Sequence, residues 1–235
     1  MDHLHGGGSI IRTGPFLQTV EVPDRATCLA QIGRPLGGEL VLYAPRGFPF
    51  GREFGDRVLA AVYEAVAALR ATTHPRLELQ LLAVDDPEEL GVIADPENLP
   101  GWVHIGGVVT PQQSLIFTRA ANIVIAEDTS TMHEACALRT ALVLVPGPIQ
   151  EATLLARCLG EHRAADVFDI ATLTSASLAA TFRNVLGGGP LRTAMTARAY
   201  DLITGGGGVE AAARLVHDIA QGQRATSVGQ RSHAR

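Results

Sequence analysis

Residues 122–146 read "NIVIAEDTSTMHEACALRTALVLVP" and join two short apolar runs through a polar cluster and a helical pattern. The runs 122–126 and 141–146 are continuous rather than alternating in hydrophobicity, which is typical of parallel strands buried on both faces. Between them, Thr131 and Glu134 have the spacing of a helix N-terminus. A strand, a polar turn, a helix and a second strand in this order predict a βαβ unit.

The rest of the chain repeats this alternation of strand and helix. Similar apolar runs occur at 39–44, 77–84 and 103–107, with a weaker one at 164–169. Helical patterns separate several of the runs. One face of the first pattern contains Phe54, Val58, Val62, Val66 and Leu69, and one face of another contains Leu154, Leu155, Cys158 and Leu159. Gly160 is predicted to end this second helix. This order predicts an α/β fold, a doubly wound, mostly parallel six-stranded Rossmann-like sheet that binds ligands at the carboxyl ends of its strands.

Helical patterns alone fill the chain after residue 170. They cover 175–186, 191–203 and 209–220, and the glycine runs at 187–190 and 205–208 separate them as turns. The last pattern has an apolar stripe that is predicted to be buried, formed by Val209, Ala212, Val216 and Ile219. The fold is therefore expected to carry extra C-terminal helices.

Three regions are expected along the chain. Residues 1–37 form a leader or connecting segment, which is either an extended connection from another domain or an ordinary edge segment. Residues 38–221 form a Rossmann-like domain, whose ligand is inferred below. The polar, basic stretch 222–235 is expected to be a disordered tail.

Composition excludes several classes of protein. The formal net charge of −5 and the pI near 5.9 argue against a nucleic-acid-binding protein, which needs a basic face. The three cysteines are odd in number and far apart, so they predict neither a disulfide framework nor a zinc cluster, and they favour a reducing, cytoplasmic location. No apolar run reaches the roughly 20 residues that span a bilayer.

The cluster from Asp128 to Glu134 has two interpretations. Thr131 and Glu134 match a capping box, in which each side chain satisfies a backbone N–H group of the helix terminus. Alternatively, the helix N-terminus at the carboxyl edge of the sheet binds a phosphate, with Ser130 and Thr131 adding hydroxyl donors. On that interpretation Glu134 accepts hydrogen bonds from the vicinal hydroxyls of a ribose. The two interpretations can coexist.

Longer stretches resemble a known family. The sequence "ANIVIAEDTSTMHEACALRTALVLVPGPIQEATLLARCL" at 121–159 resembles the signature of the carboxy-terminal, donor-binding domain of GT-B glycosyltransferases. The similarity is to family 28 in particular, which includes the peptidoglycan-precursor N-acetylglucosaminyltransferase. The segment "PENLPGWVHIGGVV" at 96–109 resembles the part that precedes this signature. The resemblance extends over about residues 38–220.

The resemblance implies a set of binding residues for a UDP-sugar. It assigns Glu134 to the ribose hydroxyls, Thr129, Ser130 and Thr131 to the diphosphate, Gln150 and Glu151 to the transferred sugar, the backbone near Val109 to the uracil edge, and Arg46 and Gly47 to the leaving diphosphate. It implies no metal and no cofactor, because the UDP-sugar is the donor substrate. Packing or surface roles are expected for His104 and His133, and a buried, inert thiol for Cys136.

The sequence departs from the family pattern at four positions. Asp128 and Thr129 occupy a turn that is normally rich in glycine, and the Asp128 carboxylate would repel a diphosphate unless it points away. Arg139 and Ile149 replace a glycine and an aspartate of the pattern. These departures predict donor binding that is weakened, altered or lost.

The resemblance predicts the donor-binding half of a hexosyltransferase. The acceptor would be held by a missing or separate N-terminal half, through which the enzyme could also associate peripherally with a membrane. The sequence identifies no catalytic base, so the catalytic residues are not assigned. Two alternatives stay open: a non-catalytic scaffold of the same fold, and a UDP-sugar epimerase or hydrolase.

Overall fold

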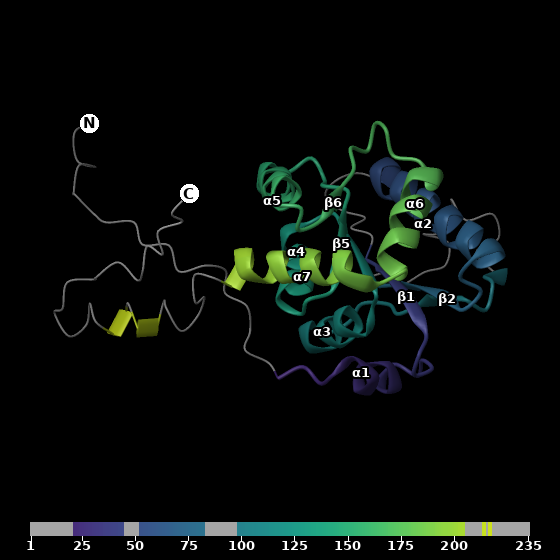
Figure 1. Cartoon of the computed structure of the whole chain (residues 1–235), viewed down its shortest axis with the longest axis horizontal. Helices are drawn as coiled ribbons and strands as arrows, with labels where there is room; N and C mark the ends of the chain where they lie inside the picture. Colours follow the sequence, from purple (N-terminus) through teal and green to yellow (C-terminus); the bar gives the residue numbers. More distant parts are fainter. Residues whose placement is uncertain (1–20, 45–51, 83–97, 205–212, 215, 218–235) are drawn as a thin grey trace.

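The computed structural model describes residues 21–44, 52–82, 98–204, 213–214 and 216–217. Its sheet has six parallel strands in the order β3-β2-β1-β4-β5-β6 (Figure 1). The strands are β1 (Glu39–Tyr43), β2 (Leu77–Leu81), β3 (Val103–Ile105), β4 (Ile123–Ala126), β5 (Ala141–Leu144) and β6 (Asp166–Val167). This order confirms the predicted doubly wound fold, and every described pairing is parallel.

Helices cover both faces of the sheet. They are α1 (Arg25–Gln31), α2 (Arg52–Thr72), α3 (Pro111–Ala120), α4 (Thr129–Ala137), α5 (Gln150–Glu161), α6 (Ser175–Leu186) and α7 (Gly189–Thr204). Helices α2 and α6 pack together over one face, whereas α1, α3, α4 and α5 cover the other, and α7 crosses to pack on α4 (Figure 1). Helices α6 and α7 are the predicted extra C-terminal helices, and the glycines at 187–189 form the turn between them.

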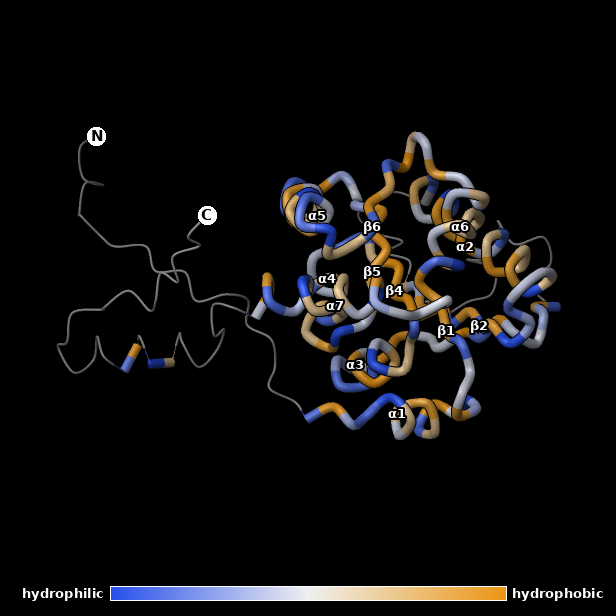
Figure 2. Tube along the Cα trace, viewed as in Figure 1, coloured by the Kyte–Doolittle hydropathy of each residue, from blue (hydrophilic) through white to orange (hydrophobic). Residues whose placement is uncertain are grey.

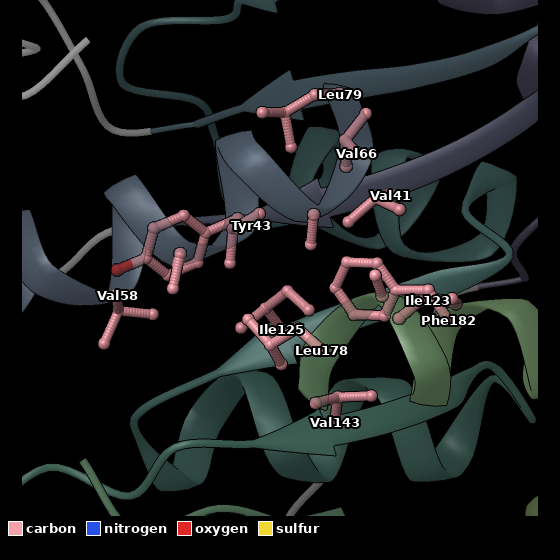
Figure 3. Packing of buried hydrophobic residues seen from close by; sticks show 14 of the residues in the cluster. Val41, Tyr43, Val58, Val66, Leu79, Ile123, Ile125, Val143, Leu178 and Phe182 are labelled. Atoms are coloured by element: carbon pink, nitrogen blue, oxygen red, sulfur yellow. The ribbon is translucent and has the colours of Figure 1, made fainter. Parts of the chain in front are cut away.

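Alternate residues of β1, β4 and β5 enter two separate cores. Val41, Ile123 and Val143 point toward α2 and α6, where they meet Leu178 and Phe182 (Figure 3). Their neighbours along the strands, Leu40, Val124 and Leu142 among them, lie in the core beneath the opposite helices. Because both faces of the central strands β4 and β5 are covered, these two strands are apolar along their whole length, and they are orange in the hydropathy view (Figure 2).

Gly160 does not end its helix. Helix α5 continues through Glu161, His162 is its C-cap, and the turn into the left-handed region falls on Arg163, at a φ of 53°. A side chain at Gly160 would meet the Val167 Cγ2 atom at 3.0 Å. Gly160 therefore allows the close approach of α5 to β6, and the prediction that it ends the helix is wrong.

Helix α1 lies within the predicted leader and was not expected. Asp24 caps it by accepting a hydrogen bond from the Thr27 backbone N–H at 2.8 Å, and Cys28 and Leu29 are buried. The Arg25 guanidinium donates to the Asn122 Oδ1 atom at 2.6 Å, which attaches α1 to the start of β4. The helix therefore packs on the domain, although the predicted boundaries at residues 37 and 221 stay untested.

Two other expectations concern the chain ends. Val216, predicted to be part of a buried stripe, is 67% exposed, because the described residues around it do not pack on the sheet. Val209, Ala212, Ile219 and the tail 222–235 lie outside the described residues. Within the described part of the chain, no helix combines the length and the hydropathy that crossing a membrane requires.

Candidate nucleotide site

The central strands β1 and β4 define the position of the candidate site. They are neighbours in the sheet, yet the helices that follow them, α2 and α4, pack on opposite faces. Loops leave such a topological switch point in opposite directions, and in open α/β sheets the carboxyl ends of the strands at this point are the usual place for a ligand. The polar residues that follow β4 therefore lie where ligands bind in open α/β sheets.

Helix α4 begins immediately after β4, and Asp128 is its N-cap. The Asp128 Oδ1 atom accepts the Thr131 backbone N–H at 3.0 Å, while the Asp128 carbonyl accepts the first helical hydrogen bond, from Met132. The predicted cap at Thr131 is therefore wrong. Aspartate caps a helix as well as serine does and better than threonine, and it comes first along the chain, so the helix starts three residues earlier.

Glu134 does not complete a capping box, because its carboxylate points to another helix. The Ser114 hydroxyl on α3 donates to the Glu134 Oε2 atom at 2.9 Å. Burial raises the pKa of Glu134, the Ser114 hydrogen bond opposes that rise, and the Asp128 carboxylate adds to it. The acid is half-buried in the second turn of α4, which is compatible with the predicted role in binding ribose.

A second acid lies at the carboxyl ends of the same two strands. Glu127, at the end of β4, is 2% exposed and accepts a hydrogen bond from the hydroxyl of the fully buried Tyr43, at the end of β1. Burial raises the pKa of Tyr43 well above its usual value, and the Glu127 carboxylate raises it further. The Glu127 carbonyl also accepts the Gly147 backbone N–H at 3.0 Å. This residue therefore joins the ends of three adjacent strands.

The other predicted site residues lie around the same edge. Thr129 and Ser130 open α4, and their N–H groups precede its first intrahelical hydrogen bond. Gln150 and Glu151 are exposed at the start of α5, whose N-cap Ile149 provides no side-chain cap. Val109, half-buried, precedes α3, whereas Arg46 and Gly47 lie outside the described residues. The assigned roles of these residues stay predictions.

Two histidines and one cysteine are expected to have packing or surface roles. Burial lowers the pKa of His133, and its ring makes no hydrogen bond within the described part of the chain. His104 pairs with Glu78 at the edge of the sheet, at 3.3 Å. Cys136 is fully buried, and that burial raises its pKa to about 12. Among the described residues, no group of three or more His, Cys, Asp or Glu side chains could hold a metal.

A cavity of about 390 Å³ lies between α5 and the segment at the end of β6. Its walls are Pro146, the α5 residues Thr153, Ala156 and Arg157, and residues 167–170 after β6. Glu134 and Gln150 do not line it, so this cavity is separate from the nucleotide site predicted at α4.

Sequence inspection missed two parts of the site. Thr110 and Gln113 form the capping box of α3, with Pro111 at the first helical position. This signal was readable from the spacing "TPQQ". The contact of Ser114 with Glu134 had no such signal, because the two residues belong to different helices.

Comparison with known proteins gives the fold. No protein-family model and no curated protein sequence matches the chain. Solved structures do: sucrose-phosphate synthase from Thermosynechococcus elongatus has a TM-score of 0.65 and 18% identity over 91% of this chain and 52% of its own. MurG from Acinetobacter baumannii has a TM-score of 0.59 and 20% identity over 85% of this chain and 53% of its own.

A third structure is itself only a half. The C-terminal domain of LpcC, a glycosyl transferase group 1 family protein from Francisella tularensis, is covered over 100% of its length by 86% of this chain, with a TM-score of 0.57 and 14% identity. The chain thus spans about half of the two longer structures and all of this domain. Likeness at such low identity shows the fold alone, the Rossmann-like fold of one half of a GT-B glycosyltransferase.

Proposed function

We propose that this chain is the donor-binding half of a glycosyltransferase and that it binds a UDP-sugar at the carboxyl edge between β1 and β4. The observation that carries the proposal is the half-buried Glu134 carboxylate, held by Ser114 beside the first turns of α4. A carboxylate accepts two hydrogen bonds from adjacent hydroxyl groups, as a ribose presents them. The helix N-terminus nearby favours the negative charge of a diphosphate.

The other roles follow from position around this acid. The backbone N–H groups of Thr129 and Ser130 would bind the diphosphate, and Gln150 and Glu151, exposed at the start of α5, would contact the transferred sugar. The acceptor and the catalytic base would come from the other half of the enzyme, in the same or another chain. Similarity to the family 28 signature supports uridine as the base and a hexose as the sugar.

A scaffold function is the second candidate, because of Asp128. Its carboxylate occupies the N-cap of α4 and places a negative charge at the position where a diphosphate would bind. Like charges a few ångströms apart repel each other, and the repulsion is larger where water is partly excluded. On this second hypothesis the protein retains the fold and does not bind the donor.

Calorimetry with UDP and UDP-N-acetylglucosamine separates the two candidates. Donor binding predicts saturable heat and a thermal shift with both ligands, whereas no heat and no shift at millimolar concentrations would favour the scaffold. Gln150→Ala should then weaken the UDP-sugar more than UDP. Equal weakening of both ligands would eliminate the assigned sugar contact.

A further inference from the structure

We infer that Ser114 is a positioning residue that holds the Glu134 carboxylate in the orientation that selects a ribose over a 2′-deoxyribose. The inference rests on the proposed function and deepens it, since it assigns the sugar specificity of the nucleotide site to a hydroxyl on a different helix. Ser114 itself is not proposed to touch the ligand.

The hydrogen bond between Ser114 and Glu134 joins α3 to α4 and leaves most of the carboxylate free to accept other donors. The Ser114 hydroxyl donates to the Glu134 Oε2 atom at 2.9 Å, and both side chains are half-buried between α3 and α4. Among the described residues, this is the one hydrogen bond that the Glu134 carboxylate makes. A carboxylate has about four lone-pair sites, so Oε1 and one site on Oε2 stay available for a pair of vicinal hydroxyls.

Helix α3 is capped at its start and bonded to the end of α4 at its own end, which limits how far Ser114 can move away from Glu134. At its start, the Thr110 and Gln113 capping box sets the first turn directly before Ser114. At its end, the Arg119 guanidinium donates at 2.7 Å to the carbonyl of Leu138, the C-cap of α4. A hydroxyl on so constrained a helix can hold the carboxylate in one rotamer before the ligand arrives.

Selectivity follows from the number of hydroxyl groups. A ribose offers two adjacent hydroxyls to the carboxylate, and a 2′-deoxyribose offers one. Only an oriented carboxylate can accept both, so an unsupported Glu134 that samples several rotamers loses more with the ribose than with the deoxyribose. The difference between UDP and dUDP therefore measures the orientation of Glu134, apart from the affinity contributed by the phosphates and the base.

The charges around Glu134 define how its ionisation responds. Burial raises the pKa of Glu134, with Ser114 opposing and Asp128 adding to the rise. The helices and strands packed on α4 carry further charged groups. Arg119 on α3 donates to the Leu138 carbonyl, Arg198 on α7 donates to the Arg163 carbonyl, and Glu127 after β4 accepts from Tyr43. Glu151 on α5 is exposed, and burial lowers the pKa of His133, which is adjacent to Glu134. Loss of the Ser114 hydroxyl should thus raise the pKa of Glu134.

The test compares Ser114→Ala with Ser114→Thr, which keeps a hydroxyl, and with Thr193→Ala, which removes a helix hydroxyl that bonds only to its own helix, at Gly189. Alanine suits a helix interior, so Ser114→Ala is expected to fold. The carboxyl titration of Glu134 is followed by NMR in the unliganded protein, and calorimetry gives the affinities for UDP and dUDP at pH 6 and pH 8.

Ser114→Ala should shift the titration midpoint of Glu134 upward and reduce the preference for UDP over dUDP by about five- to tenfold, the size expected for the net contribution of one typical hydrogen bond. UDP binding should fall more at pH 6 than at pH 8, and Ser114→Thr should restore both readouts, with Thr193→Ala unchanged. An unchanged midpoint and an unchanged UDP-to-dUDP ratio would overturn the inference. A shifted midpoint without UDP binding by any variant would instead overturn the proposed function and leave the positioning contact standing.

Discussion

Replacement of Glu134 by Gln distinguishes a ligand-binding acid from a structural one. The amide has the same shape, keeps an oxygen that accepts the Ser114 hydroxyl, and removes the negative charge. Charged hydrogen bonds to two ribose hydroxyls are lost or reduced to one neutral bond, so UDP affinity should fall by about 1–3 kcal/mol, which is about 5- to 150-fold.

The same substitution should not lower the stability of the protein. Because burial raises the pKa of Glu134, the folded state holds the proton to a higher pH than the unfolded state. The stability associated with this group is therefore fully present below the unfolded pKa and is lost as pH rises through the folded pKa. At pH 7.5 the neutral amide avoids that loss, so Glu134→Gln should unfold at the same or a slightly higher temperature than the wild type.

Calorimetry with UDP at pH 7.5 and thermal unfolding are the measurements, with Glu64→Gln, at an exposed position on α2, as the matched control. The control should change neither quantity. An unchanged affinity for UDP in Glu134→Gln, together with a fall in unfolding temperature, would refute the argument and assign Glu134 a structural role only.

Substitutions at three other positions test the surroundings of the site. Asp128→Asn keeps an N-cap acceptor and removes a charge, so UDP should bind about two- to tenfold more tightly at low salt, by calorimetry, with little change in stability; weaker binding would mean that Asp128 contacts the ligand. Tyr43→Phe removes a hydroxyl bonded to the buried Glu127 and should cost about 1–3 kcal/mol in urea unfolding, and a loss below about 0.5 kcal/mol would contradict that role. Arg139 adopts a φ of 54°, and its guanidinium stacks 3.9 Å from the Tyr200 ring centroid, so Arg139→Ala should lower the free energy of unfolding by about 0.5–1 kcal/mol. Arg139→Gly has no backbone strain and should be more stable than the alanine variant by about 1 kcal/mol; the reverse order in urea unfolding would show that the strain is absent.

Arg139 also explains one departure from the family pattern. The position follows α4 and has the left-handed backbone that favours glycine, which is the residue the pattern places there. Here an arginine occupies it, and its guanidinium stacks on Tyr200 of α7. This contact with α7, a helix far along the chain, compensates for the strained backbone. The departure at Arg139 therefore affects the packing of α4 against α7 and not the ligand site.

Much of the fold was predictable because burial leaves a local signature. A strand covered on both faces needs apolar side chains at every position, and β4 and β5 are continuous apolar runs for that reason. The weakest prediction, β6, is a two-residue strand with exposed side chains, and its position still followed from the alternation of strands and helices. Helix α1 was missed because its buried face is short, formed by Cys28 and Leu29.

Helix boundaries near the site were less predictable than the helices themselves. The segment "DTST" offers several residues able to cap a helix, and local preference alone selected Thr131. In the structure β4 ends at Ala126 and the chain turns at once, so Asp128 is the first residue able to cap α4. The position at which the preceding strand β4 ends therefore determines which residue caps α4, and the local sequence pattern does not show where that strand ends.

The sequence by itself determined the order of strands and helices and placed polar residues at the carboxyl end of β4, because hydrophobic periodicity follows from burial of one face or two. Only the tertiary structure decided which side chains meet there. Ser114 and Glu134 are 20 residues apart, and Tyr43 and Glu127 are 84 apart. Such pairs form only when packing on the sheet fixes the distance between separate helices and strands, and periodicity within one element carries no information about that distance.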